Sequence, residues 1–423
     1  MNSRKGAFPV ALIIPAVIAI ALVIALAVEI TSGKGPVSTD TDTFTESKEN
    51  DSKTDIASSD SDRETGEDTI DTVVIPATDE SSAQDTADSS AQTTAPATET
   101  TEAATDTDPV VDTTEAVWVD DGHDIVADGL IITGNRAMEF YYCSEKYTAQ
   151  YAMLVNKYAV DLEGIATVYS CVVPKPAAFY LQDSEEHGKL QAQTANALNI
   201  INENLSSDVV SVDLYSALQA HRDEYIYFRT DHHWTGLGAY YAAEAMAKAA
   251  GVPFDDISEY DTSTREGYLG SMYKYTGYNK RLENNPDDFV TYIPKTPYKG
   301  YLYDYNFENP EENPNGVYYR ISESRVSYWY STYILGDSGS FLIDTEVENG
   351  RKLLIIKDSF GNALAPYFMS SFDEIYIVDF RYFKKNVIQF VKDNGITDVA
   401  IVLNTFNAGS TPNTNLEVLR TQK

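Results

Sequence analysis

Cysteine, histidine and positive charge are all scarce in this chain of 423 residues. Its two cysteines, Cys143 and Cys171, cannot build a disulfide framework, and a large domain hardly needs a single bridge, so their pairing stays open. Its five histidines leave few ligands for a metal site, which needs three or four in all. Lysine and arginine total 31 against 65 acidic residues, giving a net charge of −34, and we expect no nucleic-acid partner.

Much of the acidic charge is concentrated in one segment. Residues 32–117 hold 22 Asp and Glu against four Lys and Arg, in runs rich in Thr, Ser and Ala such as "DTADSSAQTTAPATETTEAATDTD". Such a composition offers too few large apolar side chains to offset the entropy lost on ordering, about 1–2 kcal/mol per backbone residue. We therefore predict a disordered, acidic, Ser/Thr-rich linker over residues 30–117.

One long hydrophobic run precedes this linker. Residues 7–29 are almost free of charge and follow Arg4 and Lys5, and at about 1.5 Å per residue they can cross a hydrocarbon core of about 30 Å. This pattern predicts a membrane anchor with residues 1–6 in the cytoplasm and a domain over residues 118–423 outside the cell. The alternative is a signal peptide, because "ALA" at 25–27 fits the cleavage rule, and the protein would then be secreted.

From residue 118 onwards, strand-like and helix-like segments alternate. Apolar runs predict strands, and stripes at helical spacing predict helices between them. The predicted strands are 166–174, 209–214, 352–358, 374–380 and 398–404, and the predicted helices are 190–205, 235–250, 362–369 and 387–395. This order is typical of a three-layer α/β domain with a mostly parallel sheet. Residues 252–333 hold 15 of the 30 tyrosines and are expected to form an irregular Tyr-rich insertion over the sheet.

The motif "TDHHWTG" at 230–236 carries two adjacent histidines between an aspartate and a tryptophan. In an extended segment side chains alternate, so Asp231 and His233 should share one side while His232 and Trp234 take the other. An aspartate can then accept the Nδ1 proton of His233 and leave Nε2 as a base. His232 is interpreted as a supporting residue that makes a hydrogen bond or packs behind the site.

Ser359 is the candidate nucleophile for this base. It ends an apolar strand and opens a helix in "LLIIKDSFGNALAPYF", where the amides of the first turn are expected to supply oxyanion donors. A helix N-cap is the alternative interpretation of this serine. A second serine, Ser338 in "GDSGS", lies in a predicted turn. A metal bound by the adjacent histidines is a further alternative, although the other histidines show no spacing that completes a ligand set.

Four segments together resemble the bacterial DHHW family: "RTDHHWTGLGAYYAA", "VVPKPAAFY", "LLIIKDSFGNALAPYF" and "VDFRYFKKNV". That family looks related to the SGNH-hydrolase-like proteins that O-acetylate alginate outside the cytoplasm. The resemblance covers roughly residues 120–420. It implies an SGNH-like domain with Asp231, His233 and Ser359 as a catalytic triad. Among the matched segments, Trp234, Lys175 and Arg381 are candidate substrate-binding or supporting residues beside His232.

The resemblance implies an anchored, extracytoplasmic O-acyltransferase that moves an acetyl group to a surface or cell-wall glycan through an acyl-serine. No cofactor or metal is expected, and a membrane-bound acyl-passing partner is implied by the analogy alone. An esterase of the same type is the first alternative, because it shares the first half-reaction. A non-catalytic glycan-binding or scaffold protein is the second, since aromatic faces suit sugar stacking, although tyrosines also build ordinary strands.

The linker generates the first testable prediction. Limited proteolysis of the full chain should remove residues 30–117 and leave a resistant fragment that begins near residue 118, because an unpacked backbone is open to proteases. Mass spectrometry of the fragments measures this, and a protected segment inside the linker would contradict the composition argument.

Overall fold

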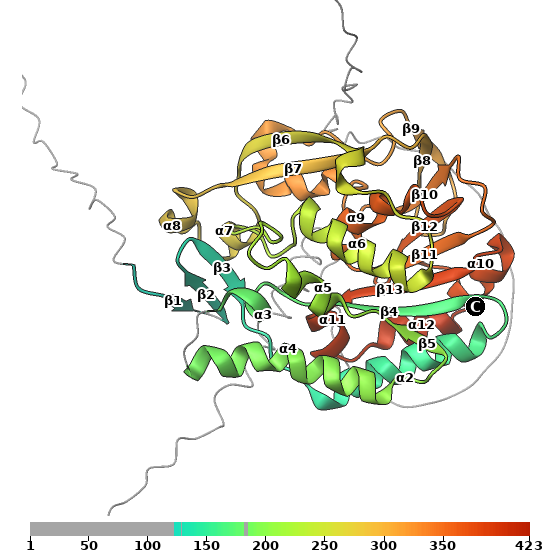
Figure 1. Cartoon of the computed structure of the whole chain (residues 1–423), viewed down its shortest axis with the longest axis horizontal. Helices are drawn as coiled ribbons and strands as arrows, with labels where there is room; N and C mark the ends of the chain where they lie inside the picture. Colours follow the sequence, from blue (N-terminus) through green and yellow to red (C-terminus); the bar gives the residue numbers. More distant parts are fainter. Residues whose placement is uncertain (1–121, 128, 182–184) are drawn as a thin grey trace, which may run out of the picture. The chain divides into compact units, whose positions relative to one another are not determined.

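The computed structural model of the chain describes residues 122–127, 129–181 and 185–423 (Figure 1). The predicted cytoplasmic N-terminus, anchor and linker all lie outside the described residues. Among the helices that are described, none is long and apolar enough to span a membrane.

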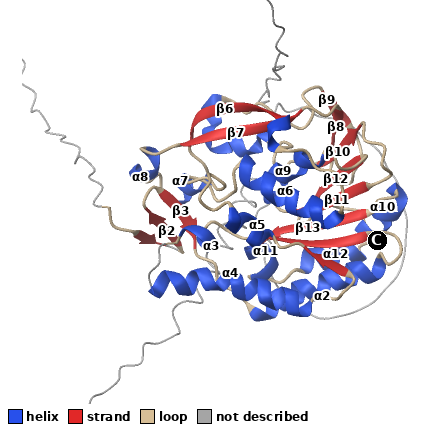
Figure 2. Ribbon diagram, viewed as in Figure 1, coloured by secondary structure: helices blue, strands red, loops and turns tan. Residues whose placement is uncertain are grey.

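An eight-stranded sheet forms the centre of the described domain (Figure 2). Five neighbouring strands are parallel, and three more continue the sheet in antiparallel pairing. The parallel strands, in spatial order, are β5 (Val209–Ser211), β4 (Thr167–Val173), β13 (Asp398–Asn404), β11 (Lys352–Lys357) and β12 (Glu374–Asp379). The antiparallel strands are β10 (Ser340–Thr345), β8 (Tyr298–Tyr303) and β9 (Glu311–Asn313). The sheet is therefore mixed rather than mostly parallel.

Helices cover both faces of the sheet, because its central strands are apolar on both sides. In β11, Leu353 and Ile355 pack into one core, and Leu354 and Ile356 pack into the other. The first face carries α5 (Leu214–Ala220), α6 (Gly236–Ala250), α9 (Phe360–Leu364) and the 3-10 helix η4 (Ala365–Phe368). The second carries α2 (Glu145–Asp161), α4 (Glu185–Asn204), α10 (Val387–Asn394), α11 (Thr405–Gly409) and α12 (Thr414–Thr421).

The Tyr-rich insertion is more regular than expected. Its segments β8 and β9 extend the central sheet. Strand β8 pairs with β10, with residues such as Gly300 and Ile343 opposite each other. The rest forms a hairpin of β6 (Tyr260–Tyr268) and β7 (Asp287–Pro294), the short helices α7 (Ser271–Tyr275) and α8 (Lys280–Glu283), and the 3-10 helices η2 (Ile257–Glu259) and η3 (Glu323–Thr332). The insertion thus both widens the sheet and covers one face.

A small antiparallel sheet that the sequence did not suggest joins the insertion to the main domain. It consists of β1 (Ile125–Ala127), β2 (Leu130–Thr133) and β3 (Arg136–Glu139). Arg136 Nη1 donates to Tyr227 O at 3.0 Å and to Phe228 O at 2.6 Å, and Ala137 N donates to Arg229 O at 3.0 Å. Strand β3 therefore holds the chain just before the two adjacent histidines.

Both cysteines are free thiols in the structure. Cys171 lies in β4, where burial raises the pKa of its thiol. It behaves as a small apolar core residue.

Candidate active site

The segment with the two adjacent histidines folds back on itself instead of running straight. Thr235 N donates to Ile226 O at 3.0 Å, and Phe228 N donates to His233 O at 3.2 Å. Gly238 permits this approach, because a Cβ at that position would lie 2.2 Å from Ile226 O. The expectation of a continuously extended segment is therefore wrong, and the side chains need not alternate.

Asp231, His233 and Ser359 form one chain of hydrogen bonds. Ser359 Oγ lies 2.7 Å from His233 Nε2, and His233 Nδ1 lies 2.6 Å from Asp231 Oδ1. Asp231 and His233 are buried, whereas Ser359 is partly exposed. A carboxylate that accepts from Nδ1 fixes the imidazole tautomer and turns Nε2 towards the hydroxyl. The geometry is that of a serine nucleophile with its base.

The Asp231 carboxylate is fully hydrogen-bonded although it is buried. Besides His233, its partners are the Ser271 N–H at 2.7 Å and the Tyr268 hydroxyl at 2.9 Å, both on Oδ2. Gly270 allows this, because a Cβ there would lie 2.3 Å from Oδ2. Burial alone would raise the pKa of Asp231, but the charge and hydrogen bonds of His233 hold it well below its usual range. The insertion thus supplies groups that keep this carboxylate ionised.

His232 lies beside the candidate base and makes a hydrogen bond of its own, one of the two supporting roles expected for it. Its ring centroid is 3.9 Å from that of His233, and its Nδ1 lies 2.5 Å from Ser271 Oγ. Burial, followed by the nearby His233 and Lys175, lowers the pKa of His232 to about 3. His232 is therefore a neutral neighbour of His233 at physiological pH.

Aromatic side chains fix the plane of the His233 imidazole. The ring of Tyr330, from η3 of the insertion, stacks on it at 3.8 Å between centroids and 5° between planes. Phe360 packs against it at 4.9 Å. Trp234 is buried behind them, and its Nε1 donates to Phe360 O at 3.2 Å. Tyr330 is thus a positioning residue that the sequence did not single out.

The turn that carries Ser359 is fixed by the buried Asp358. Its carboxylate accepts from Phe360 N at 3.0 Å, from Asn404 N at 2.7 Å and from Asn407 Nδ2 at 2.8 Å. Burial raises the pKa of Asp358, while these donors favour its ionised form. These bonds connect the end of β11 to the end of β13, so the serine position depends on the central sheet.

The first turn of α9 does not offer the set of free amide donors that we expected. Phe360 N donates to Asp358 Oδ1, Gly361 N to Asp358 O, and Asn362 N to Ser359 O. We find no acceptor for the Ser359 N–H among the described residues, so it is the donor of this turn that remains for an oxyanion.

Arg381 and Lys175 occupy different places at the site. Arg381 Nη2 lies 2.6 Å from both Asp337 and Asp379, and the fully buried Lys357 lies 2.8 and 3.0 Å from the same carboxylates. Arg381 therefore braces the 336–340 turn against the ends of β11 and β12. Lys175 lies instead beside the reacting groups, with its Nζ 5.2 Å from the ring centroid of Phe360.

The three alternative interpretations of the site are less well supported. Ser359 stands at the N-cap position of α9, but its side chain makes no capping hydrogen bond. Ser338 is exposed in the braced turn, and its Oγ donates to Leu335 O at 2.8 Å. Asp231, His232 and His233 place possible metal ligands within 4.8 Å of one another. However, both ring nitrogens of His233 are engaged, by Asp231 and by Ser359, so a metal ion bound to either nitrogen would have to replace one of these hydrogen bonds.

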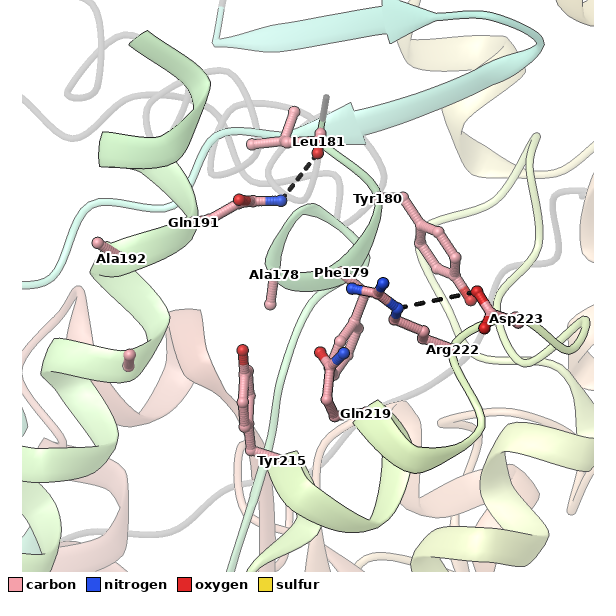
Figure 3. A pocket seen from close by; sticks show the side chains of 11 residues that line it. Ala178, Phe179, Tyr180, Leu181, Gln191, Ala192, Tyr215, Gln219, Arg222 and Asp223 are labelled. Carbon is pink, nitrogen blue, oxygen red and sulfur yellow. Dashed lines mark hydrogen bonds and ion pairs between the residues drawn. The ribbon is translucent and has the colours of Figure 1, made fainter. Parts of the chain in front are cut away.

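A separate cavity of about 550 Å³ opens beside α3 (Ala177–Tyr180), as Figure 3 shows. Phe179, Tyr180 and Tyr215 contribute aromatic faces, and Gln191 Nε2 donates to Leu181 O at 2.8 Å at its edge. The lining includes neither the candidate serine nor the two histidines. The cavity is therefore distinct from the reacting groups.

The neutral His232 generates a prediction on acid stability. Its folded pKa of about 3 lies below the ordinary value of 6.5, so the unfolded chain takes up the proton first as the pH falls. Free energy of unfolding should therefore decrease between about pH 6.5 and 3, by less than about 1.4 kcal/mol per pH unit because the ring is partly exposed. Denaturant titrations at pH 7 and 5 should show that the free energy of unfolding falls less for His232→Gln than for the wild type. An equal fall in the two proteins would contradict this prediction.

Comparison with known proteins gives the family of this chain. A family model described as DHHW protein matches residues 46–378, and no curated protein matches the chain. The crystal structure of a DHHW family protein from Eubacterium siraeum is 38% identical, with a TM-score of 0.64 over 70% of this chain and 96% of that chain.

A more distant structure, PatB1, shares the fold. Bacillus cereus PatB1, solved with a sulfonyl adduct, is 19% identical and matches with a TM-score of 0.56 over 71% of this chain and 98% of that chain. The O-acetyltransferase domain of Pseudomonas putida AlgJ is 14% identical, with a TM-score of 0.40 over 70% and 99% of the two chains, a likeness that says nothing about function. The family match and the 38% identity together establish that this chain belongs to the DHHW family.

Proposed function

We propose that the chain is a serine-dependent O-acyltransferase that moves an acetyl group to a hydroxyl of a glycan outside the cytoplasm. The observation that carries the proposal is the hydrogen-bonded series Asp231–His233–Ser359, with contacts of 2.6 and 2.7 Å. A serine hydroxyl is a weak nucleophile until a positioned base accepts its proton. Here the base is oriented by a buried, ionised carboxylate.

The reaction proceeds in two half-reactions through the same groups. Ser359 Oγ attacks the acyl carbonyl of the donor while His233 Nε2 takes the hydroxyl proton. The tetrahedral oxyanion collapses, and the leaving oxygen receives that proton from His233, which leaves an acyl-serine. A sugar hydroxyl then attacks the ester, gives its proton to His233, and the proton returns to Ser359 Oγ. Asp231 stays ionised and stabilises the imidazolium in both halves.

We choose acetyl as the transferred group and a glycan as the acceptor because the chain resembles proteins that acetylate alginate. An esterase shares the first half-reaction and differs only in using water in the second. A non-catalytic scaffold is a weaker alternative, because it has no need of three side chains in hydrogen-bond reach of one another. We also propose that residues 7–29 anchor the domain outside the membrane, with a membrane-bound partner that passes the acyl group.

Chemical labelling tests the nucleophile. A sulfonyl fluoride should modify Ser359, and Ser359→Ala should abolish both labelling and turnover of a chromogenic acetyl ester, by about 10,000-fold or more for a triad member. His233→Ala should do the same, while His232→Ala should retain acyl-serine formation. Peptide mass spectrometry locates the label. Ser338→Ala is the control, and labelling at Ser338 would overturn the assignment.

The stacked tyrosine generates a second prediction for this function. Tyr330→Leu should lower the rate of acyl-serine formation by about 2- to 10-fold, because an aromatic contact contributes about 0.5–1.5 kcal/mol. Tyr330→Phe should keep the wild-type rate, since the ring makes the contact. Stopped-flow measurement with a chromogenic ester gives the rate. Tyr158→Leu on α2 is the control for lost stability, because Tyr158 lies in the core of the opposite face.

A further inference from the structure

A buried ion pair lies at the carboxyl end of β4. Lys175 stands between Pro174 and Pro176, which restrict the backbone on both sides, and its side chain is only 4% exposed. Its Nζ lies 2.5 Å from Glu139 Oε2 at the end of β3. An ammonium group has three N–H donors, and this carboxylate is the only polar contact of Nζ among the described residues. Glu139 remains 26% exposed, so the pair opens to solvent on one side.

This pair faces the reacting groups. The Lys175 ammonium lies 5.2 Å from the ring centroid of Phe360, the residue after the candidate nucleophile, and 5.4 Å from that of Phe406. Burial would raise the pKa of Glu139, but the charge and the hydrogen bond of Lys175 hold it below its ordinary value. Glu139 also lies within electrostatic reach of the histidine pair.

An exposed aromatic ring borders the same place. Tyr275, at the end of α7, is 55% exposed and lies nearly parallel to His232, at 10° and 6.3 Å between ring centroids. Burial and the charges of Glu139 and Asp231 raise the pKa of its hydroxyl. The ring thus contacts His232 while much of its surface stays exposed to a ligand.

The chemistry of the pair selects one class of ligand. A compensated Lys–Glu pair offers a donor and an acceptor side by side but little net charge, which suits neighbouring hydroxyl groups that both donate and accept. An incoming carboxylate or phosphate would gain from Lys175 but be repelled by Glu139. A flat aromatic face beside them packs against the C–H face of a sugar ring.

We propose that Glu139 and Lys175, with the open face of Tyr275, form the acceptor subsite and bind an uncharged sugar ring through its hydroxyl groups. This inference rests on the proposed transferase function and adds the class of acceptor. The pair also ties β3 to the end of β4, and a purely structural ion pair would affect all acceptors equally. Acceptor charge therefore separates the two roles.

The experiment uses the full chain, p-nitrophenyl acetate as donor, and two acceptors: a glucose tetrasaccharide and the same tetrasaccharide oxidised to glucuronate. The nitrophenol burst measures acyl-serine formation, and mass spectrometry measures acetyl transfer. The wild type should favour the neutral acceptor. Glu139→Gln should keep the burst within about twofold and lower transfer to the neutral acceptor about 10-fold, the effect of losing a charged hydrogen bond. It should also raise the glucuronate-to-neutral ratio, because the charge of Lys175 is no longer compensated.

Matched variants complete the test. Lys175→Met should lower transfer to both acceptors without raising that ratio. The control is Glu374→Gln, which removes the carboxylate from a similar ion pair at the amino ends of β11 and β12. In that pair Lys352 Nζ lies 2.9 Å from Glu374 Oε2. This variant should change neither the acceptor ratio nor the burst. Tyr275→Ala alters an exposed side chain, so it should fold, and it should lower transfer but not the burst.

The possible failures are distinguishable. No burst in the wild type would overturn the proposed function and this inference with it. A normal burst with an acceptor ratio that Glu139→Gln leaves unchanged would overturn the subsite alone. If Glu139→Gln does not fold, Tyr275→Ala decides, and unchanged transfer in that variant would overturn the subsite.

Discussion

The hydrogen bonds to the Asp231 carboxylate are the interaction on which the rest of the site depends. A buried ionised carboxylate is costly unless its oxygens are paired. One oxygen is held by His233 and the other by Tyr268 and Ser271, which belong to the insertion. The insertion is therefore part of the catalytic machinery that we propose, and its removal would leave a charge without partners.

Two parts of the fold fix the two reacting atoms independently. Ser359 is positioned by the central sheet, because Asp358 links the ends of β11 and β13. His233 is positioned by the insertion and the small sheet, through Tyr330 above it and through the contacts of β3 with the preceding backbone. The 2.7 Å contact between their side chains is where these two supports meet.

Hydrophobic patterns in the sequence located the five parallel strands and the helices α4, α6, α9 and α10, but neither β10 nor the long helix α2. The runs at 352–358, 374–380 and 398–404 correspond to β11, β12 and β13, and Gly251 ends α6 in the left-handed conformation as its position after the helical stripe suggested. β8 and β9 escaped prediction because their tyrosines, glycine and acidic residues carry no clear alternation. The family resemblance was needed to link residues that are distant in sequence.

In the candidate site, too, the sequence predicted some contacts and missed others. The spacing of Asp231 and His233 pointed to their contact, but the reason was incomplete, since the segment folds back and His232 lies beside His233. Glu139, Ser271 and Tyr330 left no local signal, because each reaches the site through tertiary packing alone. The amides of the first turn of α9 were expected to be free for an oxyanion, but most of them donate to the residues just before them in the chain.

The separate support of base and nucleophile has a consequence for how the molecule comes apart. Local unfolding opens the less buried parts of a fold first, and β6 of the insertion is mostly exposed, whereas β11 and β13 are buried. If the hairpin of β6 and β7 opens while the central strands stay paired, the chain keeps most of its circular dichroism but loses the orientation of one imidazole. The rate of acyl-serine formation is then a more sensitive reporter of the native state than the secondary-structure signal.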